Sequence, residues 1–247
     1  MTNQPNLTQH LINQIRDVSP LILSIQKRSS TFIRSDDNGL ESDIFEHKCS
    51  AVMIQRNLVL TAAHCFDDGN RDIRLQSSYG ELTVLSIGIH NQYHRKDLID
   101  DYWKYVYDIH IENDYALIKI AEHTQLIAEL NTLSLGTNPT TTSSPTSGAL
   151  YVMGYGQVAN IFGMGEGEGQ LRISGPLAVS QQQGLRLEIR HNVKGACQGD
   201  SGGPLLSFSD HYIWLLGTVS QGDCNTFSRY QVLSQTVFDL NNFRWSK

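Results

Sequence analysis

The sequence predicts an all-β protein built from two β units. Short runs of branched, aliphatic and aromatic residues alternate with turn signals along most of the chain, which is typical of an antiparallel barrel or sandwich. A stretch rich in Ser, Thr and Pro over residues 136–148 separates two series of such runs and is expected to be a connector. The 247 residues are enough for one large domain or for two smaller ones that share an interface.

The expected elements follow one another as short strands with little helix. The first series of strands covers residues 21–25, 51–54, 58–60, 82–87 and 116–120. The second series covers residues 150–153, 185–189, 205–208 and 214–219. Residues 7–18 have a weak helical spacing of apolar side chains, and residues 237–243 are expected to form a short terminal helix. Alternating glycines over residues 163–169 disfavour both helix and strand, so a loop is expected there.

The composition excludes several classes of protein. Hydrophobic residues make up 40% of the chain and charged residues only 18%, so a packed core is expected rather than disorder. The charges sum to 19 basic against 25 acidic residues, a net −6. This balance argues against a nucleic-acid partner, because phosphate binding depends on clustered Lys and Arg. No run reaches the roughly 18 apolar residues that a membrane-spanning helix needs, so no membrane association is expected.

The first ten residues contain neither a basic segment nor an apolar core, so no signal peptide is visible. The expectation from the sequence as written is a cytoplasmic protein, with a secreted or periplasmic location as the alternative. An even number of cysteines, four, permits two disulfides without requiring them. Zinc is disfavoured because the cysteines lack the close spacing of metal ligands, and neither a metal nor a cofactor is expected.

The strongest chemical signal is the run from Gly199 to Pro204, Gly-Asp-Ser-Gly-Gly-Pro. Small neighbours let a substrate carbonyl approach Ser201, and the surrounding backbone N–H groups can stabilise a developing oxyanion. The run also satisfies the Gly-x-Ser-x-Gly pattern of α/β-hydrolases. Those enzymes carry an acid and then a histidine after the serine, whereas only His211 follows Ser201 here. Chain order therefore disfavours a lipase or esterase.

Two upstream segments complete a catalytic set. His64 lies in Thr-Ala-Ala-His-Cys, and Asp114 begins an apolar strand after Asn113. The order His, Asp, Ser is that of the chymotrypsin arrangement. With these three segments, the sequence resembles the chymotrypsin/trypsin-like serine proteases from about Pro20 to the C-terminus.

The resemblance implies a fold and a set of catalytic roles. The expected fold is two packed six-stranded antiparallel Greek-key β-barrels with a short C-terminal helix. Ser201 would be the nucleophile, His64 the general base and then acid, and Asp114 the group that orients the imidazole. The N–H groups of Gly199 and Ser201 would form the oxyanion hole.

The resemblance also divides the chain and pairs its cysteines. Residues 1–19 would be an N-terminal segment, a propeptide or regulatory arm. Residues 20–135 would form the first barrel and residues 149–247 the second, joined by the connector 136–148. The implied disulfides join Cys49 to Cys65 and Cys197 to Cys224.

The expected substrate pocket has no carboxylate at its floor. In the family, cleavage after Lys or Arg requires an acid six residues before the serine, and that position here is Gly195. A basic P1 side chain would be buried without a partner, which is unfavourable. We therefore expect an uncharged P1 preference. The pocket residues that the resemblance implies are Gly195, Ala196, Gln198, Ser220, Gly222 and Gln231.

Activation is the second departure from the family pattern. Family members are usually zymogens in which a freed N-terminal Ile or Val pairs with the aspartate beside the serine, here Asp200. No Ile-Val-Gly-Gly precedes Pro20. Two alternatives remain open: regulation by N-terminal processing or a partner, or an internal group that satisfies Asp200.

The function expected from the sequence is a monomeric serine endopeptidase that hydrolyses protein or peptide substrates through an acyl-enzyme. An activating protease or a regulatory partner is the other interaction that the resemblance implies. The alternative is a catalytically silent, protease-like binding protein. Retention of His64, Asp114 and Ser201 argues against that alternative, because a silent copy has no chemical need for all three.

Overall fold

A computed structural model describes most of the chain. The described residues are 9–35, 41–99, 106–132, 135–137, 149–159, 165–166, 169–190, 195–209, 212–225, 227–233 and 235–246. The expected connector lies largely outside these residues, as do the first eight residues and parts of the glycine-rich segment 163–169.

Seven strands from the first half of the chain and one from its C-terminal end form an eight-stranded sheet, in the order β20-β6-β9-β3-β2-β1-β4-β5. Its neighbouring strands pair antiparallel. The strands are β1 (Ile22–Ser35), β2 (Glu41–Gln55), β3 (Leu58–Thr61), β4 (Ile73–Ser77), β5 (Gly80–Leu82), β6 (Val84–His90), β9 (Ala116–Ile120) and β20 (Phe243–Ser246). The last strand comes from the C-terminal end of the chain and closes this sheet against β6.

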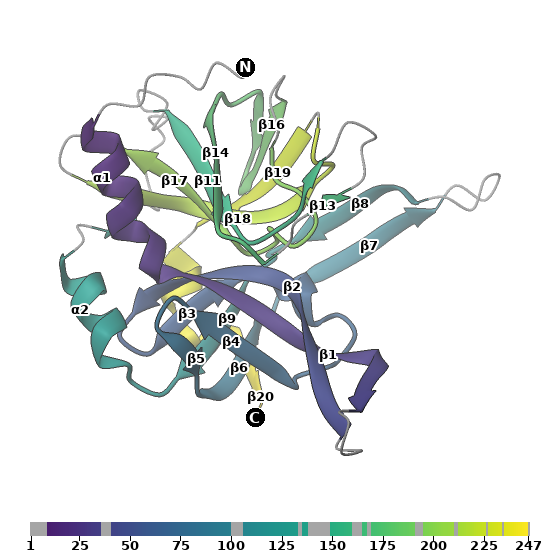
Figure 1. Ribbon diagram of the computed structural model, residues 1–247. Coiled ribbons are helices and arrows are strands. Elements are labelled where there is room, and N and C mark those ends of the chain that lie inside the picture. The colour runs from purple at the N-terminus through teal and green to yellow at the C-terminus, as the bar shows by residue number, and fades with distance from the viewer. Residues whose placement is uncertain are drawn as a thin grey trace.

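The second half forms another eight-stranded sheet, in the order β14-β11-β17-β18-β19-β16-β15, with β10 added parallel to β18. Its strands are β10 (Leu135–Thr137), β11 (Leu150–Gly154), β14 (Arg172–Leu177), β15 (Gln181–Gln183), β16 (Arg186–Arg190), β17 (Pro204–Phe208), β18 (Ile213–Gly222) and β19 (Phe227–Val232). The two curled sheets pack one above the other, with the second sheet in the upper part of Figure 1.

Two hairpins and a few helices complete the described structure. β7 (His94–Ile99) pairs with β8 (Val106–Glu112) in a hairpin that extends away from the body of the molecule (Figure 1). β12 (Val158–Ala159) pairs with β13 (Gly165–Glu166). The α-helices are α1 (Gln9–Val18) and α2 (Thr124–Thr132), and the short 3-10 helices are η1 (Ser19–Leu21), η2 (Ala63–Phe66), η3 (Gln235–Phe238) and η4 (Leu240–Asn242).

Several strands of the first sheet are buried on both faces, and this explains their continuous apolar runs. Along β9, Ala116 and Ile118 face the core enclosed by the first sheet, whereas Leu117 faces the core between the two sheets. β1 alternates in the same way, with Leu23 in the first core and Ile22 in the second. Successive side chains of a strand point to opposite faces, so a strand with two buried faces is apolar throughout.

The second sheet encloses a third core of its own. It contains Val152, Ile189, Leu205, Val219 and Tyr230. Side chains of β11 and β17, among them Met153 and Leu206, belong instead to the core between the sheets. The contact between the two sheets is therefore a continuous apolar layer built from both.

The predicted all-β fold with two barrel-like halves is confirmed. In the described residues each sheet has eight strands rather than the six expected, and these include the end strand β20 in the first sheet and the short β10 in the second. The C-terminal residues form the 3-10 turns η3 and η4 before β20, instead of one continuous helix.

The expected N-terminal helix is present as α1 and packs through Val18 and Ile15 on the core between the sheets.

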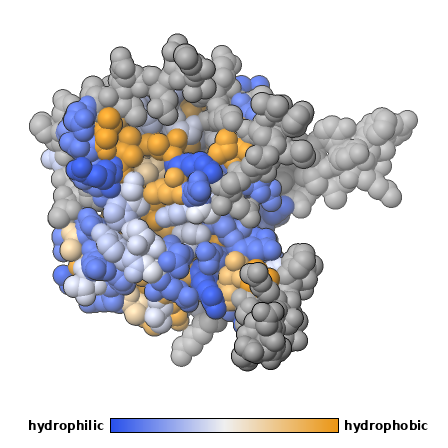
Figure 2. All heavy atoms as spheres, viewed as in Figure 1, coloured by the Kyte–Doolittle hydropathy of each residue, from blue (hydrophilic) through white to orange (hydrophobic). Residues whose placement is uncertain are grey.

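Hydrophilic residues cover much of the face seen in Figure 2, with apolar atoms showing between them. Within the described residues, no helix is long and apolar enough to cross a membrane.

We expect Leu117→Ala to lower the free energy of unfolding by about 2–5 kcal/mol, because it leaves a cavity in the apolar layer between the sheets. Leu117 is fully buried, whereas Leu85 is 53% exposed. The matched variant Leu85→Ala should change stability by less than about 0.5 kcal/mol. Urea unfolding of both variants checks this, and equal losses would contradict the packing described here.

Candidate active site

His64 is held by local structure at the end of a buried strand. β3 is buried at every position and ends at Thr61, whose hydroxyl donates to the carbonyl oxygen of Ser50 at 2.7 Å. His64 follows in η2, and the next residue, Cys65, is disulfide-bonded to Cys49. The imidazole side chain is 16% exposed, so it is accessible at one edge only.

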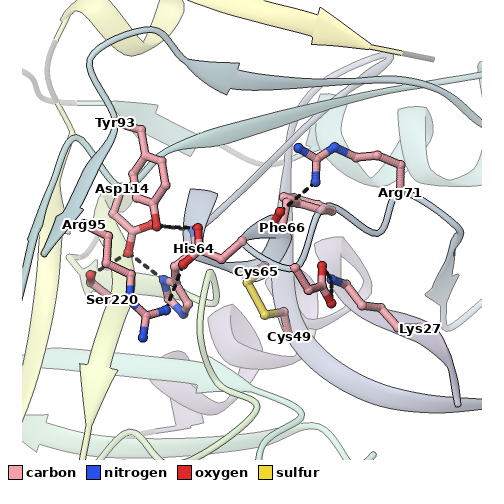
Figure 3. Close-up of polar contacts among 12 residues, drawn as sticks. Lys27, Cys49, His64, Cys65, Phe66, Arg71, Tyr93, Arg95, Asp114 and Ser220 are labelled. Atoms are coloured by element: carbon pink, nitrogen blue, oxygen red, sulfur yellow. Dashed lines mark hydrogen bonds and ion pairs between the residues drawn. A yellow bond between two sulfur atoms is a disulfide. The ribbon is translucent and has the colours of Figure 1, made fainter. Parts of the chain in front are cut away.

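Asp114 is fully buried and binds groups from both halves of the molecule. One carboxylate oxygen accepts the backbone N–H of His64 at 2.9 Å. The other accepts the His64 Nδ1–H at 2.7 Å and the hydroxyl of Ser220 at 2.5 Å (Figure 3). Because Nδ1 donates its proton to Asp114, Nε2 of the neutral imidazole is left as an acceptor.

The two groups shift each other's pKa. Burial disfavours the charged imidazole, but the charge and hydrogen bond of Asp114 outweigh burial, so the pKa of His64 is raised above 6.5. Burial also acts on Asp114, but the His64 imidazole and the bonds that the carboxylate accepts hold its pKa below the usual value. Such a pair can take a proton at neutral pH and stabilise the imidazolium that results.

An ion pair between Asp67 and Arg95 acts on the imidazole of His64. Asp67 accepts the hydroxyl of Tyr93 at 2.7 Å and pairs with Arg95 at 2.8 Å. The charge of Asp67 raises the pKa of His64 and the charge of Arg95 lowers it, so the pair acts on the imidazole in opposite directions.

Ser201 lies in the turn that leads into β17, and bonds from both sheets place it. Its carbonyl oxygen accepts the N–H of Ser50 on β2 at 2.8 Å, and the next N–H, of Gly202, donates to Val219 on β18 at 2.8 Å. Gly202 has φ +80°, and a Cβ there would lie 2.0 Å from the Thr61 hydroxyl oxygen. Only glycine fits both the backbone conformation and this contact.

The structure brings His64, Gln198, Gly199 and Ser201 together around one pocket of about 590 Å³. His64 comes from the first sheet, and the other three residues come from the turn before β17. This pocket is where a reacting carbonyl could meet both a nucleophile and a base.

The peptide of Gly199 is fixed by two side chains of β2. Its carbonyl oxygen accepts the Ser50 hydroxyl and the His47 Nε2–H, each at 2.9 Å. His47 is oriented in turn by a 2.7 Å bond between its Nδ1 and the hydroxyl of Ser24. Within the described part of the chain, the N–H groups of Gly199 and Ser201 have no hydrogen-bond acceptor. They are available to a substrate oxyanion.

Sequence reasoning missed His47, Ser50 and Ser24. His47 and Ser50 flank the predicted half-cystine Cys49, which was the available signal. Their partner Gly199 is more than 140 residues away in the sequence, so the contact depends on the packing of the two sheets.

The other predicted pocket residues fall into two groups. Ala196 lies against Gly222 and Cys224: a Cβ on Gly222 would be 2.2 Å from the Ala196 carbonyl oxygen, which accepts the Cys224 N–H at 3.1 Å. The Ala196 N–H donates to the hydroxyl of Ser228 at 2.9 Å. Ser228, which the sequence analysis did not single out, therefore lies beside Ala196.

Ser220 and Gln231 are placed differently from the rest of the predicted pocket. The Ser220 hydroxyl is bonded to Asp114. Gln231 donates through Nε2 to the Leu185 carbonyl oxygen at 3.0 Å and lines a separate pocket with Ile111 and Arg186. Among the described residues, the pocket that His64 lines does not include Gln231, and the pocket that Gln231 lines does not include His64.

Asp200 accepts two backbone N–H groups, from Gly156 and from Cys197, each at 2.9 Å. Burial nevertheless raises the pKa of Asp200 to about 6, against the lowering effect of these bonds and of the Arg172 charge. Gly195 and Asp200 line a smaller cavity of about 160 Å³ behind the Ser201 turn.

Fold and site together have the arrangement of a two-sheet serine hydrolase with a His-Asp pair. The family model described as Trypsin matches residues 20–243. The chain therefore belongs to the trypsin family and is a serine endopeptidase.

Individual relatives agree with the family match. Chymotrypsin-C of Bos taurus is 27% identical, over 79% of this chain and 76% of that protein. Trypsin delta of Drosophila erecta is 28% identical, over 78% and 76%. Trypsin delta of Drosophila melanogaster is 30% identical, over 80% and 77%.

Both predicted cysteine pairs are disulfide-bonded, Cys49 to Cys65 and Cys197 to Cys224. The expectation of a cytoplasmic protein is therefore wrong. Disulfides form and persist in oxidising compartments and are rare in the cytosol, where thiols are kept reduced. The first ten residues of the sequence do not decide the cellular location. The disulfides and the family membership point to an oxidising environment.

Asp200→Asn should remove one component of the pH dependence of stability. The pKa of about 6 in the fold exceeds the ordinary 3.8. The unfolded chain therefore ionises first as pH rises, and Asp200 lowers stability between about pH 4 and 6 by about 3 kcal/mol. The stability of Asp200→Asn relative to the wild type should rise over this window and stay constant above it.

Thermal or urea unfolding of both proteins from pH 3.5 to 8 measures this difference. A difference that does not change with pH would mean that the carboxyl ionises in the fold as it does in the unfolded chain.

Proposed function

We propose that this trypsin-family protein cleaves peptide bonds with Ser201 as nucleophile, His64 as general base and acid, and Asp114 as the orienting carboxylate. The observation that carries the proposal is the buried Asp114, which is bonded to both His64 and Ser220. Support comes from the pocket that His64, Gly199 and Ser201 share.

The chemistry follows from these positions. Nε2 of His64 takes the proton of the Ser201 hydroxyl while Oγ forms a bond to the scissile carbonyl carbon. The carbonyl oxygen becomes an oxyanion that accepts the free N–H groups of Gly199 and Ser201. The oxyanion then re-forms the carbonyl as the C–N bond breaks, and the imidazolium gives its proton to the leaving amine. Water hydrolyses the ester bond of the acyl-enzyme through the same two proton transfers and frees the Ser201 hydroxyl.

The proposed substrate side chain before the scissile bond is uncharged. Gly195 and Ala196 carry no charge, and the hydroxyl of Ser228 beside Ala196 is neutral. A Lys or Arg side chain at this place would lose its hydration without gaining a carboxylate. We include Gln198 and Gly222 among the residues that border this side chain.

We further propose that the catalytic cleft lies between two units, residues 20–135 and residues 149–247. The C-terminal strand β20 pairs with β6 of the first sheet, so backbone hydrogen bonds also connect the second unit to the first. The family implies protein substrates, and a single copy of the chain contains every residue of the proposed mechanism.

Activity in this proposal depends on a compensating charge near Asp200. A freed N-terminal amine, produced by processing or favoured by a partner, is one source of that charge. An internal cation is the other.

A fluorophosphonate probe should label the wild-type protein, and labelling should be lost in Ser201→Ala. His64→Ala and Asp114→Asn should slow labelling by about 10³-fold or more, because the hydroxyl is then not activated. Intact mass after incubation with the probe measures the extent of labelling. Ser207→Ala, at a buried serine that does not line this pocket, is the matched control.

Absence of labelling in the wild type, or labelling that persists in Ser201→Ala, would contradict the proposed nucleophile. The first of these results would favour a binding role for this family member.

Cleavage of a peptide library should favour apolar or amide side chains at P1 over Lys and Arg by about 10²-fold or more. Mass spectrometry of the products gives the preference. Introducing a carboxylate with Ser228→Asp should shift cleavage toward Lys and Arg. Strong cleavage after Arg by the wild type would overturn the proposed pocket.

A further inference from the structure

A small cavity lies behind the turn that carries Ser201. Its volume is about 160 Å³, and Gly154, Gly156, Arg172 and Asp200 are among its lining residues. A Cβ on Gly154 would lie 2.2 Å from Oδ1 of Asp200, and a Cβ on Gly156 would lie 2.6 Å from the Asp200 carboxyl carbon. Any side chain at these two positions would clash with the Asp200 carboxylate, so both positions must be glycine.

Arg172 and Asp200 bind the two backbone polar groups of the same residue, Gly156, in this cavity. Arg172, on β14, donates through Nη1 to the Gly156 carbonyl oxygen at 2.7 Å. Gly156 in turn donates its N–H to Oδ1 of Asp200 at 2.9 Å. Both charged side chains thus bind one residue, and the charge of Arg172 favours the ionised form of Asp200.

Among the described residues, Arg172 is the one cation whose charge acts on the pKa of Asp200. His47 on β2 uses Nε2 to donate to Gly199, and its Nδ1 is bonded to the Ser24 hydroxyl. Tyr230 on β19 is a neutral phenol whose pKa is raised by burial and also by the charge of Asp200. Within the described lining of the cavity, Arg172 is the one cation.

The bonds of Asp200 control the geometry of the active-site turn. The second carboxylate oxygen accepts the Cys197 N–H at 2.9 Å, and the Asp200 N–H donates to the Cys197 carbonyl oxygen at 3.0 Å. These bonds close the turn over residues 197–200, and Gly199 lies inside it. If the carboxylate were displaced, the N–H groups of Gly199 and Ser201 would lose their fixed direction.

We propose that Arg172 is a positioning residue of the active site, an internal cation that compensates the charge of Asp200 and so holds the turn carrying Gly199 and Ser201 in its reactive form. The inference rests on the proposed function and deepens it. It assigns the compensating charge to the intact chain, so that no freed N-terminal amine is needed.

The test compares four proteins with an intact N-terminus, verified by mass: wild type, Arg172→Gln, Arg172→Lys and the control Arg244→Gln. Arg244 is exposed on β20, in the other sheet. The rate of fluorophosphonate labelling is measured from pH 5.5 to 9. Hydrogen exchange of peptides spanning residues 195–203 is measured in parallel, because it reports the order of the turn without requiring catalysis.

We expect intact wild type and Arg244→Gln to be labelled at the same rate. Arg172→Gln should be labelled about 10- to 100-fold more slowly at pH 7, because the oxyanion donors are no longer held. The acid limb of its labelling rate against pH should move up by about one pH unit, since the Asp200 carboxylate loses an opposite charge. Exchange over residues 195–203 should accelerate in Arg172→Gln. In Arg172→Lys, both the labelling rate and the protection from exchange should return close to the wild-type values.

Three results would overturn the proposal. One is labelling and exchange of Arg172→Gln that match the control at every pH. Another is labelling of wild type only after cleavage of the N-terminal segment, which would assign the charge to a new amine. The third is a folded Arg172→Lys as impaired as Arg172→Gln, which would indicate a packing role.

If wild type is never labelled, the proposed nucleophile fails, and the exchange measurement still decides the role of Arg172. If Arg172→Gln does not fold, Arg172→Lys decides: near-normal labelling and exchange support charge compensation, and loss of both overturns it.

Discussion

The burial of the Asp114 carboxylate is the constraint on which the rest of the active site depends. A buried charge is unfavourable unless several hydrogen bonds and an opposite charge satisfy it. Here the satisfying groups come from separate places: the backbone and side chain of His64 in η2, and the hydroxyl of Ser220 on β18. Satisfying one carboxylate therefore joins the two sheets and sets the tautomer of the imidazole in the same step.

Asp200 presents the same physical problem with a less complete solution. Two backbone N–H groups and the Arg172 charge favour its ionised form, yet burial still raises its pKa to about 6. The ionised carboxylate thus lowers the stability of the fold while it holds the turn beside Ser201. Local instability of this kind is common where a fold holds reactive groups in position.

The packed cores beside both carboxylates limit how the two sheets can shift against each other. Strands such as β9 contribute alternate side chains to the core of the first sheet and to the core between the sheets. A shift of either sheet would therefore disturb two cores at once. Close approaches reinforce this: Gly202 packs against Thr61, and Gly154 packs against the Ser50 hydroxyl, so these two glycines mark points where the two halves meet.

The sequence by itself determined the strand content, the two-part arrangement and the three catalytic candidates. Apolar runs with turn signals and a short motif around Ser201 are local patterns, readable without knowing what lies opposite. The resemblance placed Ser220 in the substrate pocket, and only the tertiary structure shows that its hydroxyl is bonded to Asp114. His47, Ser50, Ser228 and Arg172 were not found, because their roles come from contacts with residues distant in the chain. Only the packing of one sheet on the other decides which polar groups meet a buried charge, since hydrogen bonds act over about 3 Å and carry no signature in sequence spacing.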